Sequence, residues 1–292
     1  MKKIRKAVIP AAGFGTRVLP ASKAVPKEML NIVDKPAIQY IVEEAVAAGI
    51  EDILIITNRG KAVIEDHFDH SFELEHQLEG NAEKEDILAQ VKAVSHLANI
   101  YFLRQKEAKG LGHAILCAKG FVDDEPFAVL YGDDVIISET PVTSQLIDAY
   151  NEFGNGVVGV KEVTKEQIQK YSTLKVETIR DNIMNCTDMI EKPSEDEILS
   201  LYSVLGRCIL PSEIFDILSS IPNGAGGELQ LTDAMKVLAQ NQGITAVDFD
   251  GKRYDLGNKL GILQANVEVG LKHNEIGEDF KKYLKGIIEE LN

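Results

Sequence analysis

A glycine-rich segment near the start of the chain is the first place where residue types and spacing suggest chemistry. It reads AAGFGTR over residues 11–17 and directly follows a short apolar run at residues 7–9. Small residues at the end of a strand let the backbone approach a ligand closely and turn its N–H groups toward it. We therefore expect this loop to bind phosphate groups.

Several charged side chains follow the loop at close spacing. Arg17 and Lys27 are suited to phosphate oxygens, and Lys23 is a third candidate. Glu28 directly follows Lys27, and a carboxylate beside a triphosphate would be repelled by it. We expect Glu28 to face the nucleoside or to orient the lysines. The glycines alone favour an ordinary strand-to-helix turn with solvated charges, but Arg17, residues 26–28 and residues 34–36 at this spacing favour a nucleotide site.

Two familiar nucleotide-binding loops do not fit this segment. The dinucleotide fingerprint G-x-G-x-x-G needs a third glycine, and Arg17 and Val18 stand there instead. The Walker A loop needs a Gly-Lys-Ser/Thr sequence, which does not follow. The loop therefore represents a different class of phosphate site.

A pair of carboxylates follows a second apolar run. Asp133 and Asp134 come after residues 127–131, which read FAVLY. Proteins commonly hold Mg²⁺ with one or two carboxylates together with substrate phosphate oxygens. We expect Mg²⁺ here, the alternative being an ordinary acidic turn.

Gln105 follows another apolar run, at residues 100–103. Ligands of open α/β sheets bind outside the carboxyl ends of the strands, and a side-chain amide can read the edge of a base. Gly110 lies close behind it and lets the backbone approach that base. We expect His113 to pack or to form a hydrogen bond, without a direct part in catalysis.

The elements that must position these residues follow from periodicity. Residues 37–49 and 142–153 show helical spacing, residues 61–97 indicate two or three helices, and the last 30 or so residues indicate a further helix. Continuous apolar runs at 53–56, 100–103, 127–131 and 156–160 predict buried strands. Strands that alternate with helices predict right-handed crossovers and an open α/β sheet.

Composition excludes several classes of protein. The chain has 292 residues, 45% of them hydrophobic, which suits one large α/β domain with an appendage. Its 31 basic and 46 acidic residues give a formal charge of −15, so we expect no nucleic-acid partner. An anionic substrate must then meet a local cluster of cations.

The cysteines and the apolar runs indicate the cellular compartment of the protein. Cys117, Cys186 and Cys208 are widely spaced and without a C-x-x-C motif, which indicates buried, reduced thiols of a cytosolic protein and no zinc site. No run reaches the roughly 18 apolar residues of a membrane span, and the N-terminus lacks a signal sequence. We expect a cytoplasmic protein without a membrane partner.

Six motifs, in order along the chain, together resemble the bacterial UTP–glucose-1-phosphate uridylyltransferases, a branch of the sugar-phosphate nucleotidylyltransferases. They are AAGFGTR with PKEML and DKPAIQY at 11–40, RQ with GLGHA at 104–114, YGDD at 131–134, IEKP at 190–193, GAGGELQLTDA at 224–234 and RYDLG at 253–257. The resemblance covers about residues 2–271.

The resemblance implies a fold and an assembly. It implies a Rossmann-like doubly wound mixed sheet flanked by helices, with a small sugar-binding β appendage. We expect one domain over residues 1–292, with a nucleotide-binding half at 1–140, a sugar-binding half at 141–260 and C-terminal helices at 261–292. Members of the family form homodimers or homotetramers.

The resemblance also implies a reaction and its residues. UTP and glucose 1-phosphate would give UDP-glucose and pyrophosphate with Mg²⁺, feeding cell-surface polysaccharide synthesis. The implied nucleotide-binding residues are Ala11, Ala12, Gly13, Gly15, Thr16, Glu28, Gln105, Gly110 and Asp133. The implied sugar-binding residues are Asp134, Ser172, Glu191, Lys192 and Val204. The implied catalytic residues are Arg17, Lys27 and Lys192, and the metal ligands are Asp133 and Asp255.

Three positions depart from the family pattern. Ser172 replaces a glycine whose backbone approaches the hexose, Tyr131 replaces a leucine, and Asn31 stands where proline is frequent. These departures leave open a catalytically weak paralogue that binds nucleotide sugars and regulates a true transferase. A thymidylyl- or cytidylyltransferase of the same fold is a further alternative, which PKEML and GLGHA disfavour.

Overall fold

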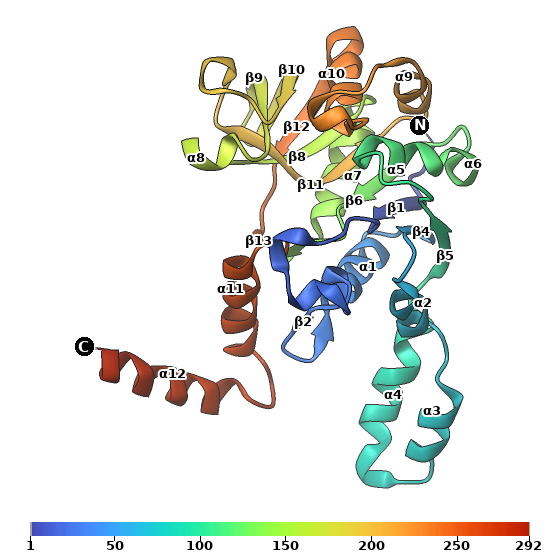
Figure 1. Cartoon of the computed structure of the whole chain (residues 1–292), viewed down its shortest axis with the longest axis vertical. Coiled ribbons are helices and arrows are strands. Elements are labelled where there is room, and N and C mark those ends of the chain that lie inside the picture. The colour runs from blue at the N-terminus through green and yellow to red at the C-terminus, as the bar shows by residue number, and fades with distance from the viewer. Residues whose placement is uncertain (1, 292) are drawn as a thin grey trace.

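A nine-stranded mixed sheet forms the centre of the molecule in the computed structural model, which describes residues 2–291 (Figure 1). In spatial order its strands are β5 (Asn99–Arg104), β4 (Asp52–Thr57), β1 (Lys6–Pro10), β6 (Phe127–Leu130), β11 (Tyr202–Leu210), β8 (Val157–Glu162), β12 (Ile244–Asp248), β10 (Ile183–Glu191) and β9 (Ser172–Arg180). Strands β5, β4, β1 and β6 are parallel, whereas β11 is antiparallel to β6 and β8. The doubly wound mixed sheet is confirmed.

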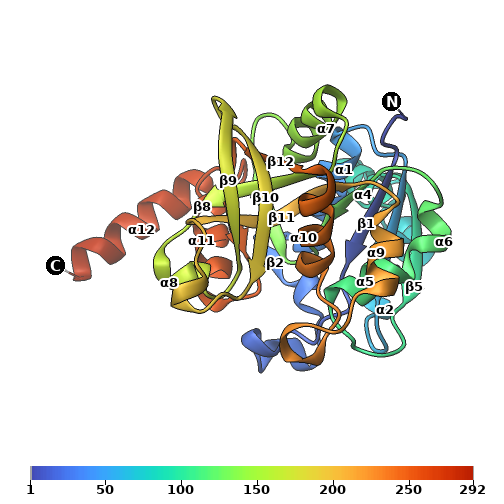
Figure 2. The same cartoon turned by 90° about the horizontal axis from the view of Figure 1, so that it is seen from above.

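Helices cover both faces of the sheet because its strands are apolar on both sides. In β1, Ala7 and Ile9 pack against α1 (Ala37–Ala47) and α7 (Val142–Phe153). Val8 points to the opposite face, which is covered by helices α5, α6, α9 and α10. These span Leu111–Cys117, Lys119–Val122, Ile214–Ser220 and Leu231–Gln242. Figure 2 shows α1 and α7 on one side of the sheet and α5, α9 and α10 on the other.

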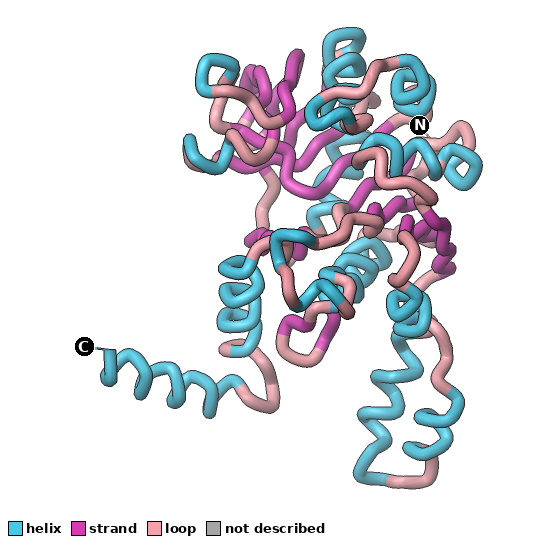
Figure 3. Tube along the Cα trace, in the orientation of Figure 1, coloured by secondary structure: helices cyan, strands magenta, loops and turns pink. Residues whose placement is uncertain are grey.

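The remaining helices lie at the periphery. They are α2 (Ala62–Phe68), α3 (Phe72–Leu78), α4 (Glu85–Val94), α8 (Lys165–Ile168), α11 (Lys259–Gly270) and α12 (Gly277–Leu291). The region 61–97 therefore forms three α-helices. Figure 3 shows α3 and α4 projecting from the body as a pair, and α12 projecting separately at the C-terminal end.

The edge hairpin β9–β10 occupies the place expected for the β appendage. It continues the main sheet, because β10 pairs with β12 as well as with β9. The boundaries at residues 140 and 260 remain predictions. The three cysteines are free thiols; Cys186 and Cys208 are buried, and Cys117 is half-buried.

Two features of the topology create the site. The chain leaves β1 toward β4 on one side and later returns to β6 on the other, which makes β1 and β6 the switch point where ligands of such sheets bind. A separate antiparallel pair, β7 (Asp134–Ile137) and β13 (Lys252–Asp255), places Asp255 directly opposite Asp134. A third small sheet, β2 (Asn31–Ile32) with β3 (Lys35–Pro36), follows the phosphate loop.

Candidate active site

Two adjoining cavities lie at the ends of β1 and β6. The first, of about 340 Å³, is lined among others by Gly13, Lys27 and Gln105. The second, of about 550 Å³, is lined by Arg17, Asp134, Gln169, Lys170, Tyr171, Lys192, Val204, Arg253 and Asp255, together with the two residues shared by both cavities. Those shared residues are Tyr131 and Asp133. The cavity with predicted nucleotide residues and the cavity with predicted sugar residues thus share the carboxylate of Asp133.

The glycine loop adopts a conformation that its sequence requires. Gly15 has φ +66°, and a Cβ on it would lie 3.1 Å from the Cβ of Ser22. The hydroxyl of Ser22 donates to the carbonyl of Gly15 at 2.7 Å, which closes the loop. A side chain at position 15 would therefore be strained and would crowd the turn.

Two residues behind the loop determine which way its peptides face. Asn58 donates through Nδ2 to the carbonyl of Ala12, and Lys61 donates through Nζ to the carbonyl of Ala11. In a trans peptide the N–H points away from the carbonyl. These contacts therefore turn the N–H groups of Ala12 and Gly13 to the opposite side, and both residues line the first cavity.

Glu28 is fully buried beside the phosphate loop. Its Oε2 accepts from Lys61 Nζ at 2.8 Å, and Oε1 has no hydrogen-bond partner among residues 2–291. Burial raises the pKa of Glu28, and the nearby Lys61 and Lys27 oppose that shift. Glu28 thus pairs with Lys61, which was not among the lysines expected to contact it, and its role toward the nucleoside stays a prediction.

The two predicted metal ligands reach a common cation. Arg17 lies 3.8 Å from Asp133 Oδ2 through Nη2 and 3.6 Å from Asp255 Oδ2 through Nη1. Lys27 Nζ lies 2.5 Å from the same Asp133 oxygen. Burial by itself would raise the pKa of Asp133, but Lys27 and Arg17 hold it below its ordinary value.

Asp133 and Asp255 each lie within 4 Å of a nitrogen of the Arg17 guanidinium. Within residues 2–291 no group of three or more Asp, Glu, His or Cys side chains converges into a metal site. Asp133 and Asp255 supply carboxylate oxygens, the donor type that hard divalent cations take, and two such ligands would leave further positions for phosphate oxygens and water.

A buried arginine organises the carboxylates further. Arg253 donates to Asp134 Oδ1 through Nε at 2.8 Å and through Nη2 at 2.6 Å. Its guanidinium lies over the ring of Tyr171, whose hydroxyl donates to Asp255 Oδ2 at 2.9 Å. Burial raises the pKa of Asp134 to about 6, although Arg253 favours its charged form.

Three of the five predicted sugar residues, Asp134, Lys192 and Val204, line the second cavity, whereas Glu191 and Ser172 do not. Lys192 is exposed at the second cavity, and its N–H donates to the carbonyl of Tyr171 at 2.7 Å. Glu191 accepts a hydrogen bond from Thr232 Oγ1 at 2.8 Å, and burial raises its pKa. Its carboxylate has oxygen lone pairs left for hydroxyl groups.

Ser172 lies in the protein interior. It is 3% exposed, and its Oγ accepts from the N–H of Val204 at 3.3 Å and lies 3.4 Å from Ser203 Oγ. Ser172 is absent from the residues that line the second cavity, whereas Val204 is among them. The hydroxyl that replaces the family glycine is thus directed at β11.

The comparisons with known proteins agree with this geometry. The family model described as nucleotidyl transferase matches residues 6–270. The chain is 52% identical over 288 residues to the UTP–glucose-1-phosphate uridylyltransferase YngB of Bacillus subtilis, covering 99% of this chain and 97% of that one. It is 50% identical to the UTP–glucose-1-phosphate uridylyltransferase of Staphylococcus epidermidis, covering 98% and 99%. The chain belongs to this uridylyltransferase family.

Solved structures of UDP-glucose pyrophosphorylases have the same fold. The enzyme from Acinetobacter baumannii matches with a TM-score of 0.89 at 39% identity, covering 99% of this chain and all of that one. A UTP-bound form from that organism matches with a TM-score of 0.88 at 39% identity, covering 96% and 98%. A structure complexed with UDP-glucose matches with a TM-score of 0.85 at 40% identity, covering 92% and 100%.

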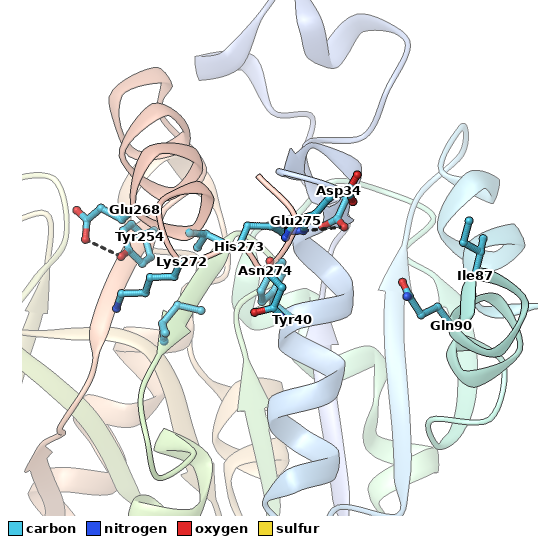
Figure 4. A pocket seen from close by; sticks show the side chains of 12 residues that line it. Asp34, Tyr40, Ile87, Gln90, Tyr254, Glu268, Lys272, His273, Asn274 and Glu275 are labelled. Atoms are coloured by element: carbon cyan, nitrogen blue, oxygen red, sulfur yellow. Dashed lines mark hydrogen bonds and ion pairs between the residues drawn. The ribbon is translucent and has the colours of Figure 1, made fainter. Parts of the chain in front are cut away.

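A larger cavity is separate from the two adjoining cavities, although Asp34, Tyr40 and Tyr254 of the motif segments line it. It measures about 700 Å³ and lies between α4 and the α11–α12 connection, with Asp34, Tyr40, Glu268 and His273 among its lining residues (Figure 4). His273 Nε2 lies 3.1 Å from Asp34 Oδ2, and Tyr254 donates to Glu268 at 3.0 Å. These polar groups pair with one another, and none of the family's predicted site residues lines this cavity.

Four residues around the site were missed by the sequence analysis as functional candidates. Asn58 and Lys61 follow β4, and no sequence motif marks them. Their partners are the carbonyls of Ala12 and Ala11, which lie far away in sequence in the loop after β1. Arg253 stands inside the RYDLG motif and Tyr171 directly precedes Ser172, so the motifs could have identified both. No helix among residues 2–291 has the length and apolar character needed to cross a membrane.

Proposed function

We propose that the chain transfers the uridylyl group of UTP to glucose 1-phosphate, giving UDP-glucose and pyrophosphate. The observation that carries this proposal is that Asp133 lines both adjoining cavities. A group held by Asp133 therefore lies between a nucleotide in the first cavity and a sugar phosphate in the second. The relatives named for this reaction support the choice of both substrates.

The divalent ion of this reaction is proposed to be Mg²⁺, held by Asp133 and Asp255. When bound there it would act as a Lewis acid and neutralise charge on the phosphates that meet between the cavities. Arg17 reaches both carboxylates. An ion on these carboxylates would take the place of Arg17, whose guanidinium would then be available to the departing pyrophosphate.

The chemistry needs no nucleophile from the protein. The sugar phosphate is already an anion, and its oxygen attacks the α-phosphorus in line while pyrophosphate leaves on the opposite side. The obstacle is repulsion, since two like charges ~4 Å apart repel by roughly 4 kcal/mol at an effective dielectric constant of 20. Lys27 and Arg17 would offset this for the triphosphate, and Lys192 for the sugar phosphate and the α-phosphate.

The binding residues divide between the cavities. In the first, the peptides of residues 11–16 would bind phosphate, and Gln105 with Gly110 would bind uracil. In the second, the backbone near Val204 would meet a sugar hydroxyl. Glu191, which is not among the lining residues, would accept from other hydroxyls of the bound sugar. Because the hydroxyl of Ser172 already accepts from the Val204 N–H, the Val204 carbonyl is the group we expect the sugar to meet.

A homodimer or homotetramer is the assembly that we propose. Apolar side chains are exposed on the C-terminal helices, including Leu260 and Leu263 on α11 and Tyr283 and Leu291 on α12. Helix α12 projects from the body, so a second copy could cover it (Figure 1). Light scattering coupled to gel filtration measures the mass in solution; a monomeric mass at micromolar concentration would contradict this assembly.

One assay tests the proposed reaction. Purified chain is incubated with UTP, glucose 1-phosphate and Mg²⁺, and pyrophosphate release is measured, with CTP, dTTP and galactose 1-phosphate in parallel reactions. We expect release to be fastest with UTP and glucose 1-phosphate. Binding of UDP-glucose without turnover would indicate a regulatory paralogue instead, and faster release with dTTP or CTP would indicate another nucleotidylyltransferase.

A further inference from the structure

The side-chain amide of Gln105 is held by two acceptors of the protein. Its Nε2 lies 3.1 Å from the carbonyl oxygen of Gly110 and 2.9 Å from Nδ1 of His113. A carbonyl oxygen can only accept, so the amide atom that faces it must be the nitrogen. An amide nitrogen can only donate, so Nδ1 of His113 accepts and the imidazole carries its proton on Nε2.

This arrangement uses both hydrogens of the amide NH₂ group. The remaining polar atom is Oε1 of Gln105, and no donor among residues 2–291 forms a hydrogen bond with it. Gln105 and Gly110 both line the first cavity, together with the phosphate loop. A ligand in that cavity therefore meets Gln105 as an acceptor only.

The acceptor carbonyl of Gly110 is itself fixed in position. Gly110 has φ +97°, and a Cβ on it would lie 2.7 Å from the carbonyl oxygen of Leu229. The N–H of Leu229 donates to Lys109 at 2.9 Å, and the N–H of Gly112 donates back to Leu229 at 2.8 Å. These two backbone hydrogen bonds clamp residues 109–112, so the amide of Gln105 cannot turn without losing its bond to Gly110.

We propose that His113 is a positioning residue for base selection. By accepting from Nε2 it keeps Oε1 of Gln105 directed at the base, where Oε1 accepts from the N3–H of uracil. The proposal rests on the proposed function, in which the first cavity holds UTP. Cytosine carries an unprotonated N3, so the same pose would place two acceptors face to face and leave both without a hydrogen.

Two substitutions of His113 separate this role from simple packing. His113→Leu keeps comparable bulk but has no acceptor, so only the hydrogen bond to Gly110 then opposes a turn of the amide that would present Nε2 to cytosine N3. His113→Asn carries Oδ1 on Cγ, where histidine carries Nδ1, and so keeps the acceptor. The measured quantity is kcat/KM for UTP divided by kcat/KM for CTP.

We expect His113→Leu to lower this ratio by about tenfold or more, and His113→Asn to keep it within about threefold of the wild-type value. The KM for glucose 1-phosphate should stay within about twofold in both variants, because the second cavity is not touched. An unchanged ratio in His113→Leu would overturn the proposal, as would an equal loss in both variants.

A substrate analogue tests the same contact in the unaltered protein. In 3-deaza-UTP a C–H group replaces the N3–H, and we expect its kcat/KM to fall by about tenfold or more relative to UTP. Equal use of the two nucleotides would overturn the proposal. A wild-type chain that releases no pyrophosphate from UTP would overturn the proposed function instead. Base selection would then be measured as the ratio of the dissociation constants of UTP and CTP, with the same expectations.

Discussion

Side chains of opposite charge lie close together in this site. Asp133 contacts Lys27 and lies near Arg17, and Asp255 lies near the same Arg17. Bringing two anionic substrates together requires that these cations be released from the carboxylates and turned to phosphate. Lys192 differs from them, because no ion pair to it is found within residues 2–291 and it is exposed at the cavity.

Lys192→Ala should therefore remove charge stabilisation without disturbing the fold. We expect kcat to fall by about 10²–10³, comparable to the loss of one transition-state donor elsewhere. The free energy of unfolding should change by no more than about 0.5 kcal/mol, because the side chain is exposed. Pyrophosphate release and urea unfolding measure the two quantities.

Lys170→Ala is the matched control for that substitution. Lys170 is also an exposed lysine that lines the second cavity, but the family motifs assign it no role. We expect kcat within about threefold of wild type. If Lys192→Ala kept wild-type turnover, or if both variants lost activity equally, a specific role for Lys192 would be refuted.

Pairs of neighbouring strands bring residues that are distant in sequence together at the site. Strand β4 lies beside β1, so Asn58 and Lys61 after β4 can contact the loop after β1. The small β7–β13 sheet similarly brings Asp255 beside Asp134. Each functional loop is thus held by a residue distant in sequence.

Substitution of Lys61 separates its effect on the free energy of unfolding from its effect on UTP binding. Lys61→Met removes the cation next to the buried Glu28, and we expect a loss of about 3–5 kcal/mol in unfolding free energy from the unpaired carboxylate. Adding Glu28→Gln should restore much of that stability. It should not restore UTP binding, because the carbonyl of Ala11 still lacks its donor and the loop peptides are no longer held. We expect the dissociation constant for UTP to stay raised by about tenfold in the double variant.

Calorimetric or fluorescence titration with UTP, beside urea unfolding, makes both measurements. A double variant with wild-type UTP affinity would show that Lys61 matters only for stability. A single variant as stable as wild type would show that Glu28 is not left as a buried charge.

The arrangement of strands and helices also explains what the sequence could and could not predict. The runs at 53–56 and 127–131 predicted β4 and β6, because strands buried on both faces are continuously apolar. The helix predicted at 142–153 is α7 over the same residues. The short strands β7 and β13 were not predicted, because four residues carry no periodicity. The contacts of Asn58 and Lys61 depend on strand neighbours, which periodicity does not report.

Glu44 and Arg207 connect the two predicted halves of the molecule. Glu44 lies on α1 and Arg207 on β11, and Arg207 Nη2 lies 2.6 Å from Glu44 Oε2 with both side chains almost fully buried. Arg207 also donates to the backbone carbonyl of Asp134 at 3.0 Å, and Glu44 accepts from the N–H and hydroxyl of Thr143. The ion pair therefore links α1, α7 and β11 to the backbone at Asp134.

Removing one partner of this pair should destabilise the whole molecule. We expect Arg207→Met to lower the free energy of unfolding by about 3–5 kcal/mol, since it leaves the Glu44 carboxylate buried and unpaired. Adding Glu44→Met should recover at least about 1 kcal/mol, because no buried charge then remains. Urea unfolding followed by circular dichroism measures both. Equal stability of the single and double variants would contradict the assigned pairing.

Anomalous diffraction from crystals grown with Mn²⁺ and UTP would show whether one divalent ion lies between Asp133 and Asp255. We expect a manganese peak about 2.1 Å from carboxylate oxygens of both residues, with the guanidinium of Arg17 withdrawn from them. A peak bound only to UTP phosphates, with Arg17 still between the two carboxylates, would contradict it.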